Sequence, residues 1–291
     1  MKKITKAVIP AAGYGTRFLP ITKSLAKEML PIIDTPAIEY IVREAIESKI
    51  EQFIIVVSGN KNAIIDYFDR NLELETILER SNKTKELEMI KELPHKVNVF
   101  FVRQKEQLGL GHAVLCAHEF IGEDDFALLL GDDVYVGNDS PALLQLINEY
   151  DKTNKSIIGT LKVPMKDTCK FGVCEYIDAS SKERLNKLKD VVEKPKVEDA
   201  PSDNVIGGRY ILTNTIFKYL KDQVTGAGGE IQLTDAIKRM MKEEDVYSYE
   251  IDGVRYDVGS KIGYIDAILD FALSRDDLKD EVKVLLQKKL K

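Results

Sequence analysis

The sequence has few of the residues that support disulfide or zinc chemistry. Its 291 residues include three cysteines and three histidines. The cysteines, Cys116, Cys169 and Cys174, form an odd-numbered set without CxxC spacing. Such a set fits neither a disulfide framework nor a cysteine-ligated zinc site. The histidines show no HxxxH or HExxH spacing, which argues against a zinc enzyme. We therefore expect the cysteines to be buried or partly buried thiols in a reducing cytoplasm.

Long apolar runs and an excess of positive charge are also missing. No stretch approaches the roughly 18 apolar residues of a membrane span. The apolar run behind the N-terminal lysines is too short for the core of a signal peptide. The net charge of −6 argues against broad binding to nucleic acid or to an anionic membrane. We expect a cytoplasmic protein without nucleic-acid or membrane partners, in which any anion binds at a local site.

The glycine loop after the first apolar run matches no complete nucleotide-binding fingerprint. Gly13 and Gly15 allow backbone N–H groups to approach an anion closely. The Rossmann fingerprint requires a third glycine where Phe18 stands, and no GK[ST] of the Walker pattern follows. The loop alone is equally typical of a tight turn. Arg17 and Lys27 favour a phosphate cradle, because a guanidinium fork and an ammonium on one loop suit a triphosphate.

The apolar pattern of the first half predicts an α/β fold with a largely parallel sheet. Short continuous apolar runs, typical of strands covered on both faces, alternate with segments of helical period. We expect strands at Lys6–Ile9, Phe53–Ser58, Val97–Val102 and Phe126–Leu130. We expect helices at Pro36–Ile50, Asn60–Arg70 and Gly111–Phe120, and a charged, solvated helical excursion at Leu72–Leu93. In the first of these helices, Thr35 is expected to be the N-cap and Pro36 to stand at N1.

The second half is looser, but no Pro/Ser/Gly linker separates it from the first. We therefore expect one continuous domain over residues 1–291. Predicted strands are Ser156–Val163, Gly172–Ile177, Leu188–Glu193, Arg209–Leu212 and Val246–Ile251. A glycine-rich segment from Gly226 leads into a helix whose first turn is expected to carry Glu230. The chain becomes helical from Ser260 (the C-terminal helical segment, about 261–291) and is expected to end in a charged amphipathic tail, Leu278–Lys291.

Carboxylates stand at the ends of predicted strands, where open α/β sheets bind ligands. Asp132 and Asp133 follow the strand FALLL, and Asp257 ends a short β-like run before a glycine. An isolated Asp-Asp pair is more typical of a turn. Two separate strand-end acids beside a glycine loop instead indicate a phosphate–metal site, because Mg²⁺ is commonly held by one or two carboxylates plus substrate phosphates. The EKP segment, Glu193–Pro195, adds a strand-end carboxylate and an ammonium.

Eight segments occur in an order that closely resembles the bacterial UTP:glucose-1-phosphate uridylyltransferase family of sugar nucleotidyltransferases. They are PAAGYGTRFLP, KEMLP, RQKEQLGLGHAV, LLGDD, VEKP, GRYIL, GEIQLTDAI and YDVGSKIGYI, spread over residues 5 to 272. The resemblance implies a single Rossmann-like α/β/α nucleotidyltransferase domain with a mixed, mainly parallel central sheet. It also implies the formation of UDP-glucose and pyrophosphate from UTP and α-D-glucose 1-phosphate with Mg²⁺, by a homodimer or homotetramer.

The resemblance further implies the following site residues. The nucleotide and its phosphates would be held by Ala11, Ala12, Gly13, Gly15, Arg17 and Lys27, and the uracil edge would be read by Gln104 and Gly109. Glucose would contact Gly172, Glu193 and Glu230, and Lys194 would hold the sugar phosphate. Asp132, beside the ribose and phosphates, and Asp257 would bind Mg²⁺. Arg17, Lys27 and Lys194 would be catalytic. Two departures stand out: Ala26 replaces the usual proline and is expected to loosen the loop of Lys27, and Leu108 replaces a residue that is often basic.

The chemistry implied by this family needs no side-chain nucleophile. A sugar phosphate is mostly dianionic at neutral pH because its second pKa is about 6. Its oxygen can attack the α-phosphorus without a general base, and charge neutralisation and in-line positioning are the main requirements. Two alternatives stay open at this point. One is the same chemistry on dTTP or another sugar 1-phosphate, and the other is a regulatory relative that binds nucleotide sugar without turnover.

Overall fold

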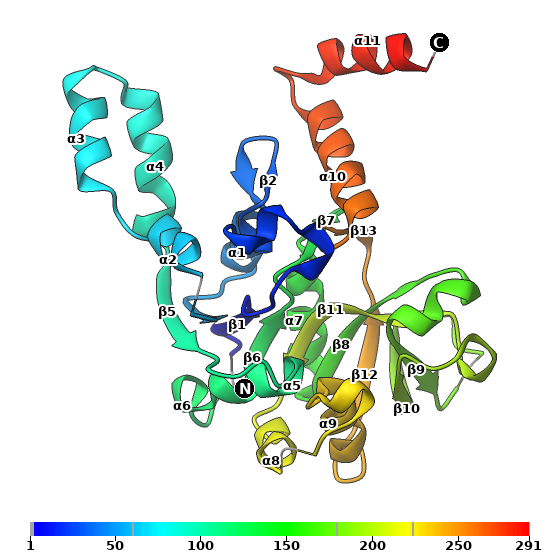
Figure 1. Ribbon diagram of the computed structural model, residues 1–291. Helices are drawn as coiled ribbons and strands as arrows, with labels where there is room; N and C mark the ends of the chain where they lie inside the picture. The colour runs from blue at the N-terminus through cyan, green and yellow to red at the C-terminus, as the bar shows by residue number, and fades with distance from the viewer. Residues whose placement is uncertain (1–2, 60, 179, 223, 291) are drawn as a thin grey trace.

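A mixed nine-stranded sheet forms the centre of the protein (Figure 1), in a computed structural model that describes residues 3–59, 61–178, 180–222 and 224–290. The strand order is β5 (Asn98–Arg103), β4 (Gln52–Val57), β1 (Lys6–Pro10), β6 (Phe126–Leu129), β11 (Asn204–Leu212), β8 (Ser156–Lys162), β12 (Val246–Glu250), β10 (Leu185–Glu193) and β9 (Gly172–Tyr176). The first four strands are parallel, and β12 is parallel to β8. β11 is antiparallel to both of its sheet neighbours, and β10 and β9 form an antiparallel edge.

Helices cover both faces of this sheet, as the continuous apolar strands predict. In β1, Ala7 and Ile9 pack into one apolar cluster and Val8 into the other. The first cluster lies under α1 (Ala37–Glu47), α2 (Asn62–Phe68), α7 (Ala142–Thr153) and α10 (Lys261–Ser274). The second lies under α5 (Leu110–Cys116), α6 (His118–Ile121), α8 (Ile216–Lys221) and α9 (Leu233–Met240). The α/β/α class with a mixed sheet is confirmed.

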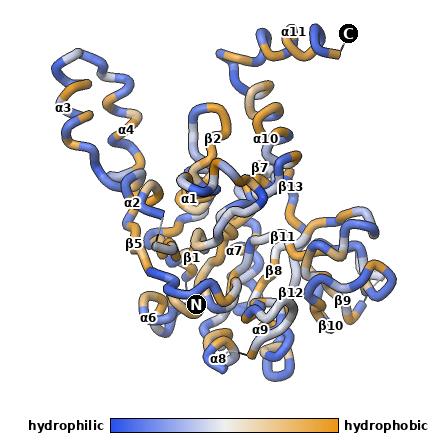
Figure 2. The backbone as a smooth tube through the Cα atoms, viewed as in Figure 1, coloured by the Kyte–Doolittle hydropathy of each residue, from blue (hydrophilic) through white to orange (hydrophobic). Residues whose placement is uncertain are grey.

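Two helical arms project from this sandwich (Figure 1). One is the pair α3 (Leu72–Arg80) and α4 (Thr84–Lys96), which is the predicted charged excursion. The other is α10, whose Ala267 still packs into the first apolar cluster, followed by α11 (Lys279–Lys289). Figure 2 shows hydrophilic and hydrophobic positions interspersed along both arms. The end of the predicted tail, Lys291, lies outside the described residues.

Two short antiparallel ribbons accompany the main sheet. β2 (Pro31–Ile32) pairs with β3 (Thr35–Pro36), and β7 (Asp133–Gly137) pairs with β13 (Gly253–Asp257). The second ribbon was not predicted, although it carries the expected strand-end acid Asp257. Its register places Asp257 opposite Asp133, which brings the YDVGS segment to the carboxyl end of β6.

Several predicted helix boundaries are wrong. Thr35 does not cap α1, because it pairs within the β2–β3 ribbon and Pro36 takes the N-cap position. The predicted helix Gly111–Phe120 is divided into α5 and α6 at Ala117. Glu230 precedes α9 rather than lying in its first turn, where Asp235 stands. Asn60, at the start of another predicted helix, lies outside the described residues, and α2 begins at Asn62.

The described cysteines are free, and their burial differs from the expectation at one position. Cys174 is buried and Cys116 is half-buried, but Cys169 is exposed because it lies in a surface 3₁₀ turn, Met165–Lys170. None of the described helices combines the length and the apolar character that crossing a membrane would require.

The backbone at Ala26 suggests a stabilising substitution. Ala26 has φ −60° and ψ 135°, which proline also adopts, and its N–H donates to no described residue. We expect Ala26→Pro to raise the free energy of unfolding by about 0.4–1 kcal/mol, because proline reduces the freedom of the unfolded chain. Urea unfolding measures the effect. Ala45→Pro, inside α1, is the control and should be strongly destabilising. A lower midpoint for Ala26→Pro would contradict the prediction.

Candidate active site

The glycine loop presents a row of free backbone donors. Ala11 N donates to Val56 O at 2.8 Å, which fixes the start of the loop. Within the described parts of the chain, no acceptor is recorded for the N–H groups of residues 12–16. Gly15 has φ +66°, and a Cβ there would lie 3.2 Å from Lys27 Cβ, so the left-handed turn and the close approach both favour glycine. Consecutive free N–H groups of this kind form an anion-binding concavity.

Two carboxylates converge beside the loop. Asp132 follows β6 and Asp257 ends β13. A Cβ at Gly259 would lie 2.4 Å from Asp132 Oδ2 and 3.1 Å from Asp257 Oδ1, so both carboxylates lie close to the Gly259 backbone and a larger residue there would collide with them. The two acids reach this point from strands that are more than 100 residues apart in the sequence.

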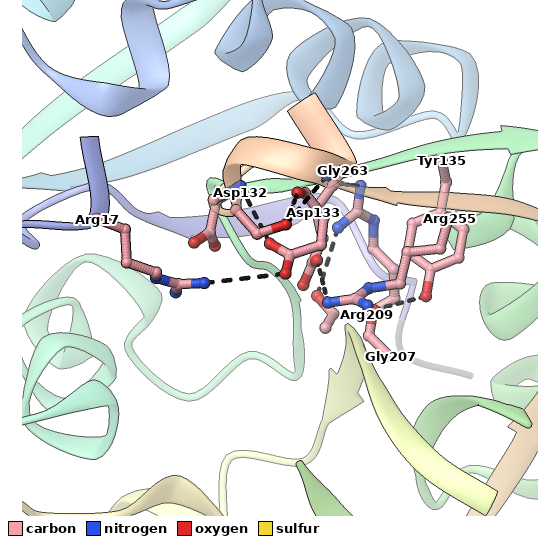
Figure 3. A network of polar contacts seen from close by, with 12 residues as sticks. Arg17, Asp132, Asp133, Tyr135, Gly207, Arg209, Arg255 and Gly263 are labelled. Atoms are coloured by element: carbon pink, nitrogen blue, oxygen red, sulfur yellow. Dashed lines mark hydrogen bonds and ion pairs between the residues drawn. The ribbon is translucent and has the colours of Figure 1, made fainter. Parts of the chain in front are cut away.

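Each of these acids has a cation as its nearest charged partner. Lys27 Nζ lies 2.5 Å from Asp132 Oδ2, and Arg17 Nη1 lies 3.9 Å from Asp257 Oδ2, the contact drawn from Arg17 in Figure 3. Burial is the largest influence on the pKa of Asp132 and would raise it, but Lys27, Arg17 and Arg255 together outweigh burial and the pKa falls below its ordinary value. The pKa of Lys27 is raised, because Asp132 and then Glu28 outweigh its desolvation. Lys27 and Asp132 therefore form a charged pair at neutral pH.

A buried ionic network supports the acids from behind (Figure 3). Arg255 Nη2 lies 2.5 Å from Asp133 Oδ1, and Arg209 donates to Asp133 O at 2.7 Å and to Glu44 Oε2 at 2.7 Å. Burial raises the pKa of Asp133 to about 6, with Arg255 opposing the shift and the Asp132 charge adding to it. The network joins α1, β7, β11 and β13, and so fixes the two strand-end acids relative to the sheet.

One cavity of about 500 Å³ opens at the end of β10. It is lined by Arg17, Leu110, Leu130, Asp132, Asp133, Lys170, Phe171, Gly172, Glu193, Lys194, Ile206, Tyr210, Glu230, Gln232, Leu233, Thr234, Arg255 and Asp257. Glu193 accepts a hydrogen bond from Thr234 Oγ1 at 2.6 Å and lies 3.1 Å from Lys194 Nζ. Lys194 has φ +44°, an uncommon backbone for a residue other than glycine.

A second cavity of about 380 Å³ adjoins the first. It is lined by Pro10, Gly13, Tyr14, Gly15, Thr16, Lys27, Glu28, Gln104, Gln107, Gly109, Leu110, Ala113, Leu130, Gly131, Asp132 and Glu230. Gln104 Nε2 donates to Gly109 O at 3.2 Å and contacts His112 Nδ1 at 3.0 Å. Both cavities are lined by Asp132 and Glu230, so a ligand in one can reach a ligand in the other at Asp132.

Most of the predicted residues line these cavities, but two do not. Ala11 and Ala12 are buried beneath the glycine loop, so their side chains do not face either cavity. Glu28 was missed. It is buried, Lys61 Nζ lies 2.9 Å from its Oε2, and its Oε1 has no partner among the described residues. Arg255 was also missed, although it stands two positions before Asp257. A charged residue close in the sequence to a predicted site residue was the available signal.

The mixed sheet, with polar cavities at the carboxyl ends of its parallel strands, places the protein in the doubly wound class of ligand-binding α/β folds. Residues 6–273 match the family described as nucleotidyl transferase, and the chain belongs to this family.

Its relatives and structural neighbours carry more specific names. It is 50% identical over 282 residues to the UTP–glucose-1-phosphate uridylyltransferase of Bacillus subtilis, covering 97% of this chain and 96% of the relative. A solved UTP-bound UGPase from Acinetobacter baumannii is 41% identical, with a TM-score of 0.90, and the match covers 98% of this chain and 99% of that one. A UDP-glucose pyrophosphorylase complexed with UDP-glucose is 42% identical, with a TM-score of 0.85, over 94% and 100% of the two chains.

Proposed function

We propose that the protein transfers UMP from UTP to α-D-glucose 1-phosphate, forming UDP-glucose and pyrophosphate. The observation that carries this proposal is the junction of two cavities at Asp132, with the free N–H groups of the glycine loop and Lys27 on one side and Lys194 on the other. Such a junction suits two anionic substrates that must meet. The names and ligands of the related proteins support the same assignment.

The smaller cavity is proposed to bind UTP. The glycine loop, from Ala11 and Ala12 through Gly13 and Gly15, would hold the triphosphate through its backbone, with Lys27 beside the phosphates. Arg17 lines the larger cavity and not the smaller one, so its guanidinium would reach the phosphates from the side of the junction. Gln104 and Gly109 would read the uracil edge. Because Gln104 uses its Nε2 in hydrogen bonds within the protein, its Oε1 is left to accept from the N3–H of uracil.

The larger cavity is proposed to bind glucose 1-phosphate. Glu193 and Glu230 would accept hydrogen bonds from sugar hydroxyls, and Lys194 would neutralise the sugar phosphate. At Gly172 a Cβ would lie 3.2 Å from Glu193 Oε2, so glycine keeps room for the sugar beside this carboxylate. Arg17 and Lys27 would stabilise the charge on the UTP phosphates during an in-line attack by the sugar phosphate on the α-phosphorus.

Asp132 and Asp257 are proposed to hold Mg²⁺. Their carboxylates both lie close to Gly259 and both line the larger cavity, and two carboxylates completed by substrate phosphates are a usual Mg²⁺ site. No cluster of three or more potential ligands occurs in the described ranges, which fits an ion that needs phosphate oxygens to complete its shell. When bound, Mg²⁺ would supply positive charge to the phosphates and help to align them. Arg255, through Asp133, would keep the two acids in position.

Pyrophosphate release from each nucleoside triphosphate, with glucose 1-phosphate and Mg²⁺, tests the proposed activity. We expect release with UTP and far less with dTTP in direct competition. Absence of UTP-dependent release at saturating Mg²⁺ would overturn the proposal. Tight binding of UDP-glucose in calorimetry without turnover would instead identify a regulatory relative.

The assembly and location of the protein are also proposals. We propose that residues 1–291 form one domain. We further propose that the protein is cytoplasmic and assembles as a homodimer or homotetramer. The arm formed by α10 and α11 supports self-association, because Ile262 is 76% exposed and Leu285 is 51% exposed. Light scattering coupled to size-exclusion chromatography tests this expectation, and a monomer at micromolar concentration would contradict it.

Lys194→Ala is expected to raise the KM for glucose 1-phosphate about 10- to 100-fold, since a charge-assisted hydrogen bond contributes about 1.5–3 kcal/mol. The KM for UTP should change much less, because Lys194 lines only the larger cavity. Steady-state kinetics with each substrate varied in turn measure the difference. Lys196→Ala is the matched control, as Lys196 is exposed and lines neither cavity. A defect confined to UTP would move Lys194 to the nucleotide side.

A further inference from the structure

Tyr14 joins the two walls of the smaller cavity. It stands between Gly13 and Gly15, and its hydroxyl donates to Gln107 Oε1 at 2.6 Å across 93 residues of sequence. Both side chains line the cavity, and Tyr14 is 62% exposed. Tyr14 and Gln107 therefore bridge the glycine loop and the segment between β5 and α5 at the rim of the cavity. We call this pair the Tyr14–Gln107 bridge.

The two walls differ in how firmly they are held. On the Gln107 side, Gln104 N donates to Val57 O, and Leu108 O accepts from Ile231 N at 2.7 Å. On the Tyr14 side, the N–H groups of residues 12–16 have no recorded acceptor among the described residues. The bridge thus ties a loop with few backbone hydrogen bonds to a wall that is fixed by several.

The chemistry of Tyr14 suits a planar ligand. It is the one large side chain in the run Ala11–Gly15, and its ring is exposed on the lining of a cavity that also presents Leu110 and Ala113. Aromatic rings bind nucleobases by stacking, whichever base it is, because every base has a π-face. Stacking on a base would also bury part of the exposed aromatic ring of Tyr14 at the cavity rim, which is favourable.

We propose that Tyr14 covers the base of the bound nucleotide, and that its hydrogen bond to Gln107 closes the rim and slows nucleotide release. Neither residue has been given a role in the transfer site above. The inference rests on the proposed function in one respect only, that the smaller cavity binds a nucleoside triphosphate. The bridge opens to admit the nucleotide and re-forms over it, so its strength sets the dissociation rate.

The test measures UTP binding to the full-length protein in the presence of Mg²⁺. Calorimetry gives the Kd, and a chase of radiolabelled UTP with excess unlabelled UTP gives the dissociation rate. The variants are Tyr14→Phe, which keeps the ring, Gln107→Ala, and the two combined. Gln287→Ala, at an exposed glutamine on α11, is the matched control.

Each single variant should release UTP about three- to tenfold faster, the effect of one neutral hydrogen bond. The double variant should be no faster than the singles, because both remove the same bond. Tyr14→Ala, which also removes the ring, should release UTP faster than Tyr14→Phe. The KM for glucose 1-phosphate at saturating UTP should not move in Tyr14→Phe, which a general disturbance of the site would change.

Unchanged release in Tyr14→Phe and Gln107→Ala would overturn the inference, and so would additive effects in the double variant. Equal release from Tyr14→Ala and Tyr14→Phe would overturn the covering role of the ring. These results are distinct from a failure of the proposed function, in which the unmodified protein itself would not bind UTP.

Discussion

Asp132→Asn is expected to lower kcat/KM for the UTP reaction by about 10²–10³-fold, with folding largely intact. An amide is a poorer ligand for Mg²⁺ than a carboxylate, and losing one preorganised electrostatic contact at a transition state has an effect of this size. Asp132 lines both cavities, so the loss should affect the meeting of the two substrates rather than the binding of one. Asp257→Asn should show a similar defect.

The measurement is the rate of pyrophosphate release over a titration of Mg²⁺, with thermal unfolding recorded for each variant. Both variants should need more Mg²⁺ for half-maximal rate, which separates a metal role from general damage. Asp139→Asn is the control, because Asp139 is exposed and lines neither of the two cavities. Wild-type rates in Asp132→Asn and Asp257→Asn would contradict the metal assignment.

Lys27→Ala is expected to lower kcat by about 10²–10³-fold. Lys27 is the ammonium on the wall of the smaller cavity, where UTP is proposed to bind, and it could leave Asp132 for the triphosphate. A cation aimed at developing phosphate charge stabilises the transition state more than the ground state, so kcat should fall along with kcat/KM.

Steady-state kinetics with UTP and with glucose 1-phosphate varied measure the effect of Lys27→Ala. Lys23→Ala is the matched control, because Lys23 is exposed on the same loop and lines neither cavity. The requirement for Mg²⁺ should change less than in Asp132→Asn. If Lys27→Ala and Lys23→Ala gave equal rates, Lys27 would have no role in the transfer.

The parts of the fold that depend on local pattern were predictable. Runs such as FIIVVS, apolar at nearly every position, indicated strands covered on both faces, and β4 contributes Ile54 and Val56 to one cluster and Phe53 and Ile55 to the other. Glycines after β1 and acids after β6 and β13 marked the ligand-binding edge. Periodicity depends on neighbouring residues, which is why the prediction of the fold class was confirmed.

The features that depend on pairing between distant segments were not predictable. Asp133 and Arg255 meet because β7 and β13 pair in one register, and no local pattern sets that register. Tyr14 and Gln107 are 93 positions apart, and no local pattern indicates that they meet. Thr35 is typical of a helix N-cap in the sequence, but in the structure it pairs with Ile32 in the β2–β3 ribbon. The candidate site residues were proposed from motifs, and their partners in the fold could be seen only in the structure.

With the proposed function, the pairs Lys27–Asp132 and Arg17–Asp257 would make substrate binding an exchange of counter-ions. Without ligands, the two acids balance the two cations, so the site carries no large uncompensated charge. A metal–triphosphate complex carries both positive and negative charge. Its metal ion can take the place of Lys27 and Arg17 beside the two acids, while its phosphates form new ion pairs with the displaced Lys27 and Arg17. A bare triphosphate or a bare metal ion offers only half of this exchange. Lys27 and Asp132 would thus select for the complex over either component, before any chemistry begins.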